Sequence, residues 1–394
     1  MLAPYGTSDM FVESSGQATA LVELVRRWRV CSGGPEPSEL LTEEKLSELS
    51  RQIGVTRVAS TTLLDRIGVP TGYAVRPAAL HPAAIYSSGK GATRFEADVT
   101  AVFESYERWA AEESLYSFVA TLPQIVRWAD ALDFHYIVPD EFDEEREYRW
   151  SLGKDISDDR VLVMPSEWVE FPPPGRFGYR CSTTGLAAHT NLDQAILSGA
   201  LECFERHHTA GLAIEELRRI DGRRFGQLAR SLLERFTAND IEIHCFLLAQ
   251  AAAYSVVYCY GFDQALRFPQ LHCSGFAAGI DMQHALVSAL LEVAQGRAAF
   301  ASGLRDDVAR SVRPKQTHAC HDAMQLSWLE RLRAVSTLAA PQPTLRSGHR
   351  TLSKELAIEL KAAAGIETIG CFPLRQVLEY PAVRVVVPEF NDCD

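Results

Sequence analysis

One spacing pattern of alanine, a hydroxyl residue and glutamate occurs three times in this chain of 394 residues. In each copy the hydroxyl residue follows the alanine by three positions and the glutamate follows it by seven. Exposed helices have no reason to keep a small residue and a hydroxyl in register with a carboxylate. The pattern therefore predicts three related helices that meet at one site. The copies are Ala97-x-x-Thr100-x-x-x-Glu104-x-x-Glu107-Arg108, Ala195-x-x-Ser198-x-x-x-Glu202-x-x-Glu205-Arg206 and Ala285-x-x-Ser288-x-x-x-Glu292-x-x-Gln295-x-Arg297.

The central copy shows what each helix would present. With about 100° of rotation per residue, Ala195, Ser198, Glu205 and Arg206 fall within about 60° of Glu202, and the opposite face is apolar. Glutamate and arginine at this spacing also occur on ordinary solvated faces, where a pair contributes only ~0.3–0.5 kcal/mol. A solvated face is the simpler interpretation of one copy, whereas three copies in register favour a shared site.

Convergence of these helices would gather four carboxylates, which are those of Glu104, Glu107, Glu202 and Glu205. Such a cluster raises the pKa values of its members unless cations neutralise it. Mg²⁺ is the natural counterion, because it takes a few carboxylate oxygens and completes its shell with phosphate and water. The arginines of the three copies can then bind phosphate oxygens through forked hydrogen bonds. The pattern therefore predicts a site for a metal-bridged nucleoside triphosphate.

Other sequence features narrow the class of protein. The net charge of −12 argues against a nucleic-acid partner, and the chain shows neither a signal peptide nor a membrane span. Nine scattered cysteines without a Cys-x-x-Cys pair indicate reduced thiols in the cytoplasm. The motif His318-Ala319-Cys320-His321 lacks a second ligand pair and is a weak metal candidate. The short Gly89-Lys90-Gly91 motif is no Walker loop, although Lys90 at the start of a repeat helix can reach a phosphate.

The order of elements predicts an α+β fold with mixed or antiparallel sheets, in which three strand-turn-helix repeats converge on a nucleotide site. We expect an N-terminal helical extension over 1–55 and one catalytic domain over 56–394. Residues 134–175 are expected as edge strands and loops because of their prolines. Small-residue turns are predicted to lead into the repeat helices, at 87–91, 185–191 and 275–279. Strands are predicted at 55–62, 70–77, 177–184, 241–251, 253–261, 271–275 and 383–387, and helices at 94–113, 122–132, 322–337 and 352–364.

These motifs together resemble the YcaO family, in family order over about residues 56–390. The resemblance implies an enzyme that depends on ATP and Mg²⁺ and acts on a backbone amide of a peptide. A nucleophile adds to the amide carbonyl, and the oxygen is phosphorylated and leaves as phosphate. Beside the three copies, the matching motifs are Leu64-Asp65-Arg66-Ile67-Gly68-Val69-Pro70, Ala74-Val75-Arg76-Pro77, Gly89-Lys90-Gly91, Gly185-Leu186-Ala187-Ala188, Gly303-x-Arg305-Asp306-Asp307 and Val383-Arg384-Val385-Val386-Val387-Pro388.

The resemblance also assigns roles to individual residues. It implies that the four glutamates hold Mg²⁺, namely Glu104, Glu107, Glu202 and Glu205. It implies that seven further residues line the nucleotide, namely Lys90, Thr100, Asn191, Ser198, Arg206, Gln295 and Arg297.

The leading hypothesis is a stand-alone cyclodehydratase that forms an azoline at Cys, or at Ser or Thr, of a ribosomally made precursor peptide. The same activation gives a thioamide with a sulfide nucleophile or an amidine with an amine, and a non-catalytic peptide-binding subunit is the alternative from another class. Partnered azoline-forming members often end in Pro-x-Pro-x-Pro, whereas this chain has one proline after Val387. Only about 55 residues precede the predicted fold, so we expect no fused peptide-recognition domain. A separate peptide-recognition or sulfur-delivery protein, and a homodimer, are open alternatives.

Overall fold

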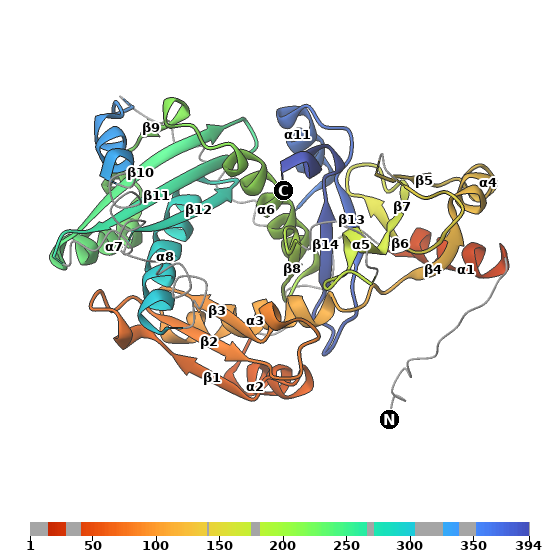
Figure 1. Ribbon diagram of the computed structural model, residues 1–394, viewed down its shortest axis with the longest axis horizontal. Helices are drawn as coiled ribbons and strands as arrows, with labels where there is room; N and C mark the ends of the chain where they lie inside the picture. The colour runs from red at the N-terminus through yellow and green to blue at the C-terminus, as the bar shows by residue number, and fades with distance from the viewer. Residues whose placement is uncertain are drawn as a thin grey trace, which may run out of the picture.

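The computed structural model of the protein describes residues 15–28, 41–139, 142–174, 182–265, 272–303, 326–338 and 352–393. Three sheets and their helices surround the middle of the molecule (Figure 1). Within the described ranges, each helix is too short or too polar to span a bilayer. The α+β class, with mixed and antiparallel sheets, is confirmed.

The first sheet contains β1 (Arg57–Ser60), β2 (Thr71–Val75) and β3 (Tyr86–Lys90) in antiparallel order. The helix α3 (Arg94–Ala110) packs on it, and α2 (Glu43–Gln52) packs on α3. The predicted turn at 87–91 is wrong, because most of it is strand β3. A Cβ atom at Gly89 would lie 2.0 Å from the carbonyl oxygen of Ala97, so this glycine lets α3 approach the strand closely.

The second sheet has the order β12-β11-β10-β9 and is antiparallel. The helices α7 (Gly226–Ala238) and α8 (Met282–Ala301) pack on it in one core. The predicted turn at 275–279 is also wrong, because these residues lie in strand β12 (Cys273–Gly279). A Cβ atom at Gly275 would lie 2.0 Å from the carbonyl oxygen of Ala289 in α8. Both glycines let a helix backbone come close to the strand. The strands are β9 (Arg218–Arg219), β10 (Ile241–Gln250), β11 (Ser255–Asp263) and β12 (Cys273–Gly279).

The third sheet has the order β5-β7-β6-β13-β14-β8, and β4 pairs with β6. The expectation of edge strands over 134–175 is wrong for β6, which pairs with β4, β7 and β13. The strand predicted at 177–184 is absent from residues 182–184, and residues 177–181 lie outside the described ranges. The strands are β4 (Ser117–Thr121), β5 (His135–Tyr136), β6 (Glu147–Asp155), β7 (Val161–Pro165), β8 (Leu186–Ala188), β13 (Gly370–Pro373) and β14 (Ala382–Val386).

Two long helices pack on β13, β14 and β8 of this sheet, and they are α6 (Leu192–Ala210) and α11 (Lys354–Ala364). The strand β8 occupies residues 186–188 of the predicted turn at 185–191, and Asn191 is the N-cap of α6. The predicted helix 122–132 is confirmed as α4 (Leu122–Leu132). The strand predicted at 383–387 is confirmed as β14, one residue earlier. The short helix α5 (Ser166–Val169) follows β7.

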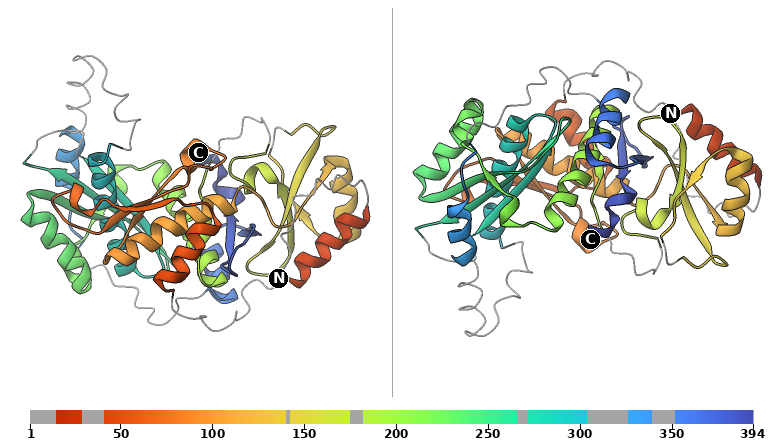
Figure 2. Two further views of the ribbon diagram at one scale, coloured as in Figure 1. Left: turned by 90° about the horizontal axis from the view of Figure 1, so that it is seen from below. Right: turned by 90° about the horizontal axis from the view of Figure 1, so that it is seen from above.

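The two N-terminal helices belong to different cores. The helix α1 (Ser15–Arg27) packs through Val22 and Val25 on the core of β4, β6 and α4, and α2 packs on α3. Figure 2 shows α1 beside α4 at one end of the molecule, away from α2. Thr42 caps α2 by accepting a hydrogen bond from the Lys45 amide at 3.3 Å. The division into an extension and a catalytic domain stays a prediction.

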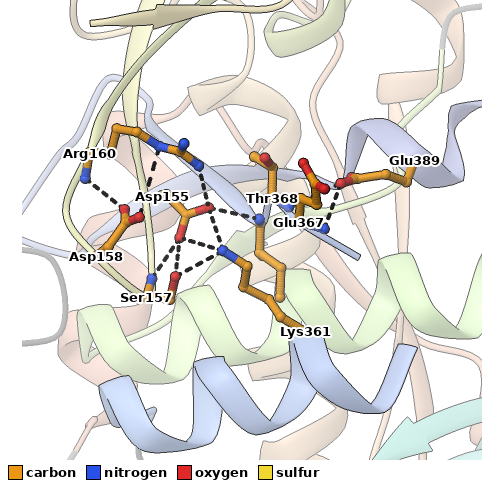
Figure 3. A network of polar contacts seen from close by, with 9 residues as sticks. Asp155, Ser157, Asp158, Arg160, Lys361, Glu367, Thr368 and Glu389 are labelled. Carbon is orange, nitrogen blue, oxygen red and sulfur yellow. Dashed lines mark hydrogen bonds and ion pairs between the residues drawn. The ribbon is translucent and has the colours of Figure 1, made fainter. Parts of the chain in front are cut away.

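A buried polar network holds α11 and β13 to the end of β6 (Figure 3). Asp155 is fully buried and accepts hydrogen bonds from the Ser157 amide at 2.8 Å and the Ser157 hydroxyl at 2.6 Å. It also accepts from Lys361 Nζ of α11 at 3.2 Å and from the Ile369 amide at 3.3 Å. This Asp155 network is a structural use of a buried carboxylate.

Candidate nucleotide site

The three repeat helices and strand β3 meet at one cavity of about 710 Å³. In Figure 1, α3, α6 and α8 surround the middle of the molecule, and each packs mainly on a different sheet. The volume is within the ~300–1,000 Å³ of small-molecule sites. The lining residues are Leu41, Ser88, Lys90, Val99, Thr100, Phe103, Glu104, Glu107, Ala188, His189, Thr190, Glu202, Glu205, Arg206, Glu292 and Gln295.

The helix α3 brings Glu104 and Glu107 to the cavity. It begins with a capping box, in which Thr93 and Glu96 exchange hydrogen bonds with each other's backbone amides. Glu104 pairs with Arg108 one turn later, and Glu107 accepts a hydrogen bond from the Ala188 amide of β8 at 3.0 Å. This last contact links the first and third sheets at the site.

The helix α6 brings Glu202, Glu205 and Arg206 to the same cavity. Glu202 accepts a hydrogen bond from the Gly185 amide at 3.2 Å. Arg206 lies 3.7 Å from Glu202 and 3.9 Å from Glu205 and keeps 49% of its side-chain surface exposed. These long contacts leave donors of the guanidinium available for a further anion.

The helix α8 completes the cavity with Glu292 and Gln295. Lys90 Nζ of β3 lies 3.3 Å from Glu292 Oε2, and Gln295 Nε2 donates to Ser88 Oγ of β3 at 3.0 Å. The Thr100 hydroxyl accepts from the Lys90 amide at 2.9 Å and donates to the Lys90 carbonyl at 2.8 Å. The hydroxyl of the first repeat therefore holds the backbone from which Lys90 extends.

The electrostatics of the cavity favour a bound cation. Burial raises the pKa of Glu104 and of Glu202 above the usual range, despite the nearby Arg108 and Arg206. Burial, together with the carboxylates of Glu104 and Glu202, raises the pKa of Glu107 further. Burial and the Glu292 carboxylate raise the pKa of Glu205 to about 7. The protein places more negative charge around the cavity than its own cations neutralise there.

The structure brings together eight of the eleven predicted site residues. The eight that line the cavity are Lys90, Thr100, Glu104, Glu107, Glu202, Glu205, Arg206 and Gln295. Ser198 is an exposed residue of α6 outside the lining, and Asn191 accepts hydrogen bonds from the Asp193 and Gln194 amides at 2.8 and 3.3 Å. Arg297 is buried in ion pairs with Asp65 and Asp263, also outside the lining.

Several residues that line the cavity are not among the eleven that the sequence predicts. Glu292 occupies the glutamate position of the third repeat, so the repeat itself was a signal for it. Ser88, His189 and Thr190 carry no such local signal, because strand pairing and the position of β8 bring them there. Burial lowers the pKa of His189, so its imidazole is neutral at pH 7. The lining also includes the apolar side chains of Leu41, Val99 and Phe103.

The donor set fits Mg²⁺ that arrives with a nucleotide. Within the described ranges, no three side chains of His, Cys, Asp or Glu converge closely enough to hold a metal ion by themselves. Mg²⁺ usually takes one or two carboxylates and completes its shell with phosphate oxygens and water, so a full protein cage is not required. The weak motif at 318–321 lies outside the described residues.

Comparisons with known proteins place this geometry in a family. A family model described as YcaO cyclodehydratase, ATP- and Mg²⁺-binding, matches residues 88–391. An uncharacterized protein of Methanothermobacter thermautotrophicus is 30% identical over 372 residues, which cover 89% of this chain and 93% of the relative. ATP and Mg²⁺, the cofactors predicted from the sequence, are those of the family description.

Solved structures have the same fold. A YcaO from Methanopyrus kandleri bound with AMPPCP and Mg²⁺ has a TM-score of 0.67 at 24% identity, covering 88% of this chain and 90% of that one. A heterocyclase in complex with substrate and cofactor has a TM-score of 0.62 at 18% identity, covering 90% of this chain and 54% of that one. With a family model over most of its length and a similar relative along nearly all of it, this chain belongs to the YcaO family.

Proposed function

We propose that this chain uses ATP and Mg²⁺ to activate a backbone amide of a ribosomally made precursor peptide, and that it converts a Cys, or a Ser or Thr, into an azoline. The observation that carries the proposal is the convergence of four glutamates and Arg206, from two helices of related sequence, on one cavity. A non-catalytic peptide-binding subunit would gain nothing from retaining four carboxylates that repel one another.

The glutamates of α3 and α6 would hold Mg²⁺. Glu104 and Glu107 face Glu202 and Glu205 around the cavity, and their raised pKa values indicate that a cation would stabilise them. When bound, Mg²⁺ supplies positive charge that offsets the charge on phosphate oxygens. The protein's part is to supply carboxylate oxygens from two elements that the sheets hold in place.

Three polar side chains are suited to the phosphates. Lys90 is a point charge at the end of β3, and Arg206 is a partly exposed guanidinium on the other side of the cavity. Gln295 adds an amide that already donates to Ser88 of β3. Thr100 holds the backbone of Lys90, and Asn191 fixes the start of α6 by capping it. These contacts would orient a triphosphate chain between β3 and α6.

The chemistry explains why an amide needs this site. The oxygen of an amide is a poor leaving group, and its phosphorylation by bound ATP lets it leave as phosphate after the Cys thiol has added to the carbonyl. Positioning and charge neutralisation supply most of the catalysis of such a transfer. The nucleophile belongs to the peptide, or to a partner that delivers sulfur, so a thioamide or an amidine product would use the same residues.

The remaining parts of the proposal concern the surroundings of the enzyme. The substrate is a precursor peptide, which is recognised by this chain or delivered by a separate protein. We place the protein in the cytoplasm, because its nine cysteines are scattered along the sequence without a Cys-x-x-Cys pair.

Peptide-dependent phosphate release tests the proposal. The variants Glu202→Ala and Glu205→Ala should lose at least about 100-fold in release rate, because each removes a carboxylate from the cation site. Glu234→Ala, at an exposed position of α7, is the matched control and should retain the wild-type rate. Turnover that is unchanged in the two cavity variants would reject the cation site. The mass of the product peptide identifies the reaction, with loss of water for an azoline and exchange of oxygen for sulfur for a thioamide.

A further inference from the structure

Arg297 lies in the third repeat but outside the cavity. It is two residues beyond Gln295 on α8, which is a rotation of about 200° around the helix. Its side chain is 4% exposed, and Nε and Nη2 donate to Asp65 at 2.8 and 3.1 Å. Nη2 also donates to Asp263 Oδ2 at 3.0 Å. Gln295 therefore faces the cavity, whereas Arg297 faces a buried pair of carboxylates.

One carboxylate lies in a connection of the first sheet, and the other lies in a strand of the second sheet. Asp65 follows η1 (Thr62–Leu64) in the connection between β1 and β2, and Asp263 is the last residue of β11. Arg66, next to Asp65, pairs with the other oxygen of Asp263 at 2.8 Å and donates to the Asn239 carbonyl. We call these four residues, Asp65, Arg66, Asp263 and Arg297, the Arg297 cluster. It joins the first sheet to the second sheet and to α8.

The same two sheets meet again at the cavity. There Lys90 and Ser88 of β3 contact Glu292 and Gln295 of α8, and α8 lies between the two sheets in Figure 1. The side chains of Lys90 and Glu292 keep 26% and 30% of their surface exposed. A partly exposed pair of this kind contributes little by itself. The side chains of Asp65 and Asp263 are only 8% and 0% exposed, so the Arg297 cluster is the better-enclosed connection between the same elements.

We infer that Arg297 is a positioning residue for the nucleotide site, and that it acts through Asp65 and Asp263 to hold β3 against α8. The cluster thereby keeps Lys90 opposite Glu292 and Gln295. The planar guanidinium suits this role, because its fork binds the two oxygens of Asp65 and reaches Asp263 at the same time. The functional part of this inference rests on the proposed nucleotide site, whereas the mechanical part does not.

A double-mutant cycle between Arg297→Gln and Asp65→Asn tests the inference. Each single variant should weaken the affinity for MgATP, measured by calorimetry, by about fivefold to tenfold. The double variant should bind MgATP with about the same affinity as the single variant that binds it less tightly, because both changes break the same connection. If Arg297 bound the phosphates itself, Asp65→Asn would leave the affinity nearly unchanged and the two effects would add. That result would overturn the inference.

Hydrogen exchange without nucleotide gives a second, independent measure. The backbone amides of β3 should exchange faster in both single variants than in the wild type, and Arg297→Lys should restore slow exchange in part because it keeps one ion pair. Arg94→Gln, which breaks an exposed ion pair on α3, is the control and should change neither exchange nor affinity.

If wild-type protein does not bind MgATP, the proposed function fails, and exchange in β3 still decides whether the connection exists. Exchange in β3 that is as slow in both single variants as in the wild type would overturn the inference. If Arg297→Gln does not fold, Asp65→Asn and Arg297→Lys carry the same comparison.

Discussion

Two groups of carboxylates in this protein have opposite surroundings. Asp155 lies between Lys361, both donors of Ser157 and the Ile369 amide, so the protein itself surrounds the charge with donors. Glu107 accepts a hydrogen bond from the Ala188 amide but faces the carboxylates of Glu104 and Glu202, and burial together with these carboxylates raises its pKa. The difference indicates which group stabilises the fold and which is arranged for a cation.

The surroundings of the two groups support this distinction. The Asp155 network lies between β6, α11 and β13 and connects parts of one core (Figure 3). The glutamates line a cavity where three sheets meet, and Glu104 and Glu202 keep 28% and 29% of their side-chain surface exposed. A charge that serves stability is enclosed and paired, whereas a charge that serves binding remains accessible to its ligand.

The largest effect on stability is expected at the Asp155 network. Lys361→Met removes the cation and leaves the carboxylate of Asp155 buried without its main partner, which should lower the free energy of unfolding by about 3 kcal/mol. Urea unfolding of the two proteins measures the difference. As a control, Arg331→Gln breaks an ion pair whose side chains are 52% and 73% exposed, and it should cost less than about 0.5 kcal/mol. Equal costs for the two variants would remove the distinction between the groups.

The pH dependence of stability should show that a cavity carboxylate, unlike Asp155, destabilises the folded protein when it is charged. The pKa of Glu205 is about 7 in the folded protein and lies near the ordinary value of 4.5 when the chain is unfolded. Between these values the folded state binds more protons, so stability is fully present below about pH 4.5 and falls as the pH rises to about 7. In protein free of Mg²⁺, this carboxyl should reduce the free energy of unfolding by at most about 3 kcal/mol across that range. Urea unfolding at several pH values measures it.

A matched variant isolates the contribution of this carboxyl. Glu205→Gln should flatten the decrease between pH 4.5 and 7, because it removes the titrating group and keeps its shape. Glu234→Gln, at an exposed position, should leave the decrease as it is in the wild type. Equal decreases in the wild type and in Glu205→Gln would contradict the raised pKa of Glu205 and the burial and repulsion that cause it.

Much of the site could be predicted because it lies on regular helices. The register of alanine, hydroxyl and glutamate is a local property of each helix, so it shows in the sequence before any tertiary contact is known. The face of Arg297 was also open to prediction, since it lies about 200° from Gln295 on the same helix. The resemblance to the family implies that both residues line the nucleotide, whereas the helical geometry separates them.

The rest depended on contacts between distant parts of the chain. Gly89 and Gly275 suggested turns, because glycine is equally typical of turns and of strands that a helix approaches closely. Asp155 has no distinguishing feature in the sequence, and its partner Lys361 is 206 positions away. Ser88 and His189 reach the cavity through strand pairing, which a local pattern does not show.

The smallest effect is expected from neutralising one carboxylate of the cavity, with Asp155 as the comparison. Glu107→Gln removes a charge that burial and two neighbouring carboxylates disfavour, so it should raise the free energy of unfolding by about 1 kcal/mol in the absence of Mg²⁺. Asp155→Asn should lower it, because Lys361 then loses its counterion. Urea unfolding of the two variants gives the two signs. The same sign in both would mean that the cavity glutamates are as well satisfied as Asp155, and the case for a cation site would then lose its electrostatic basis.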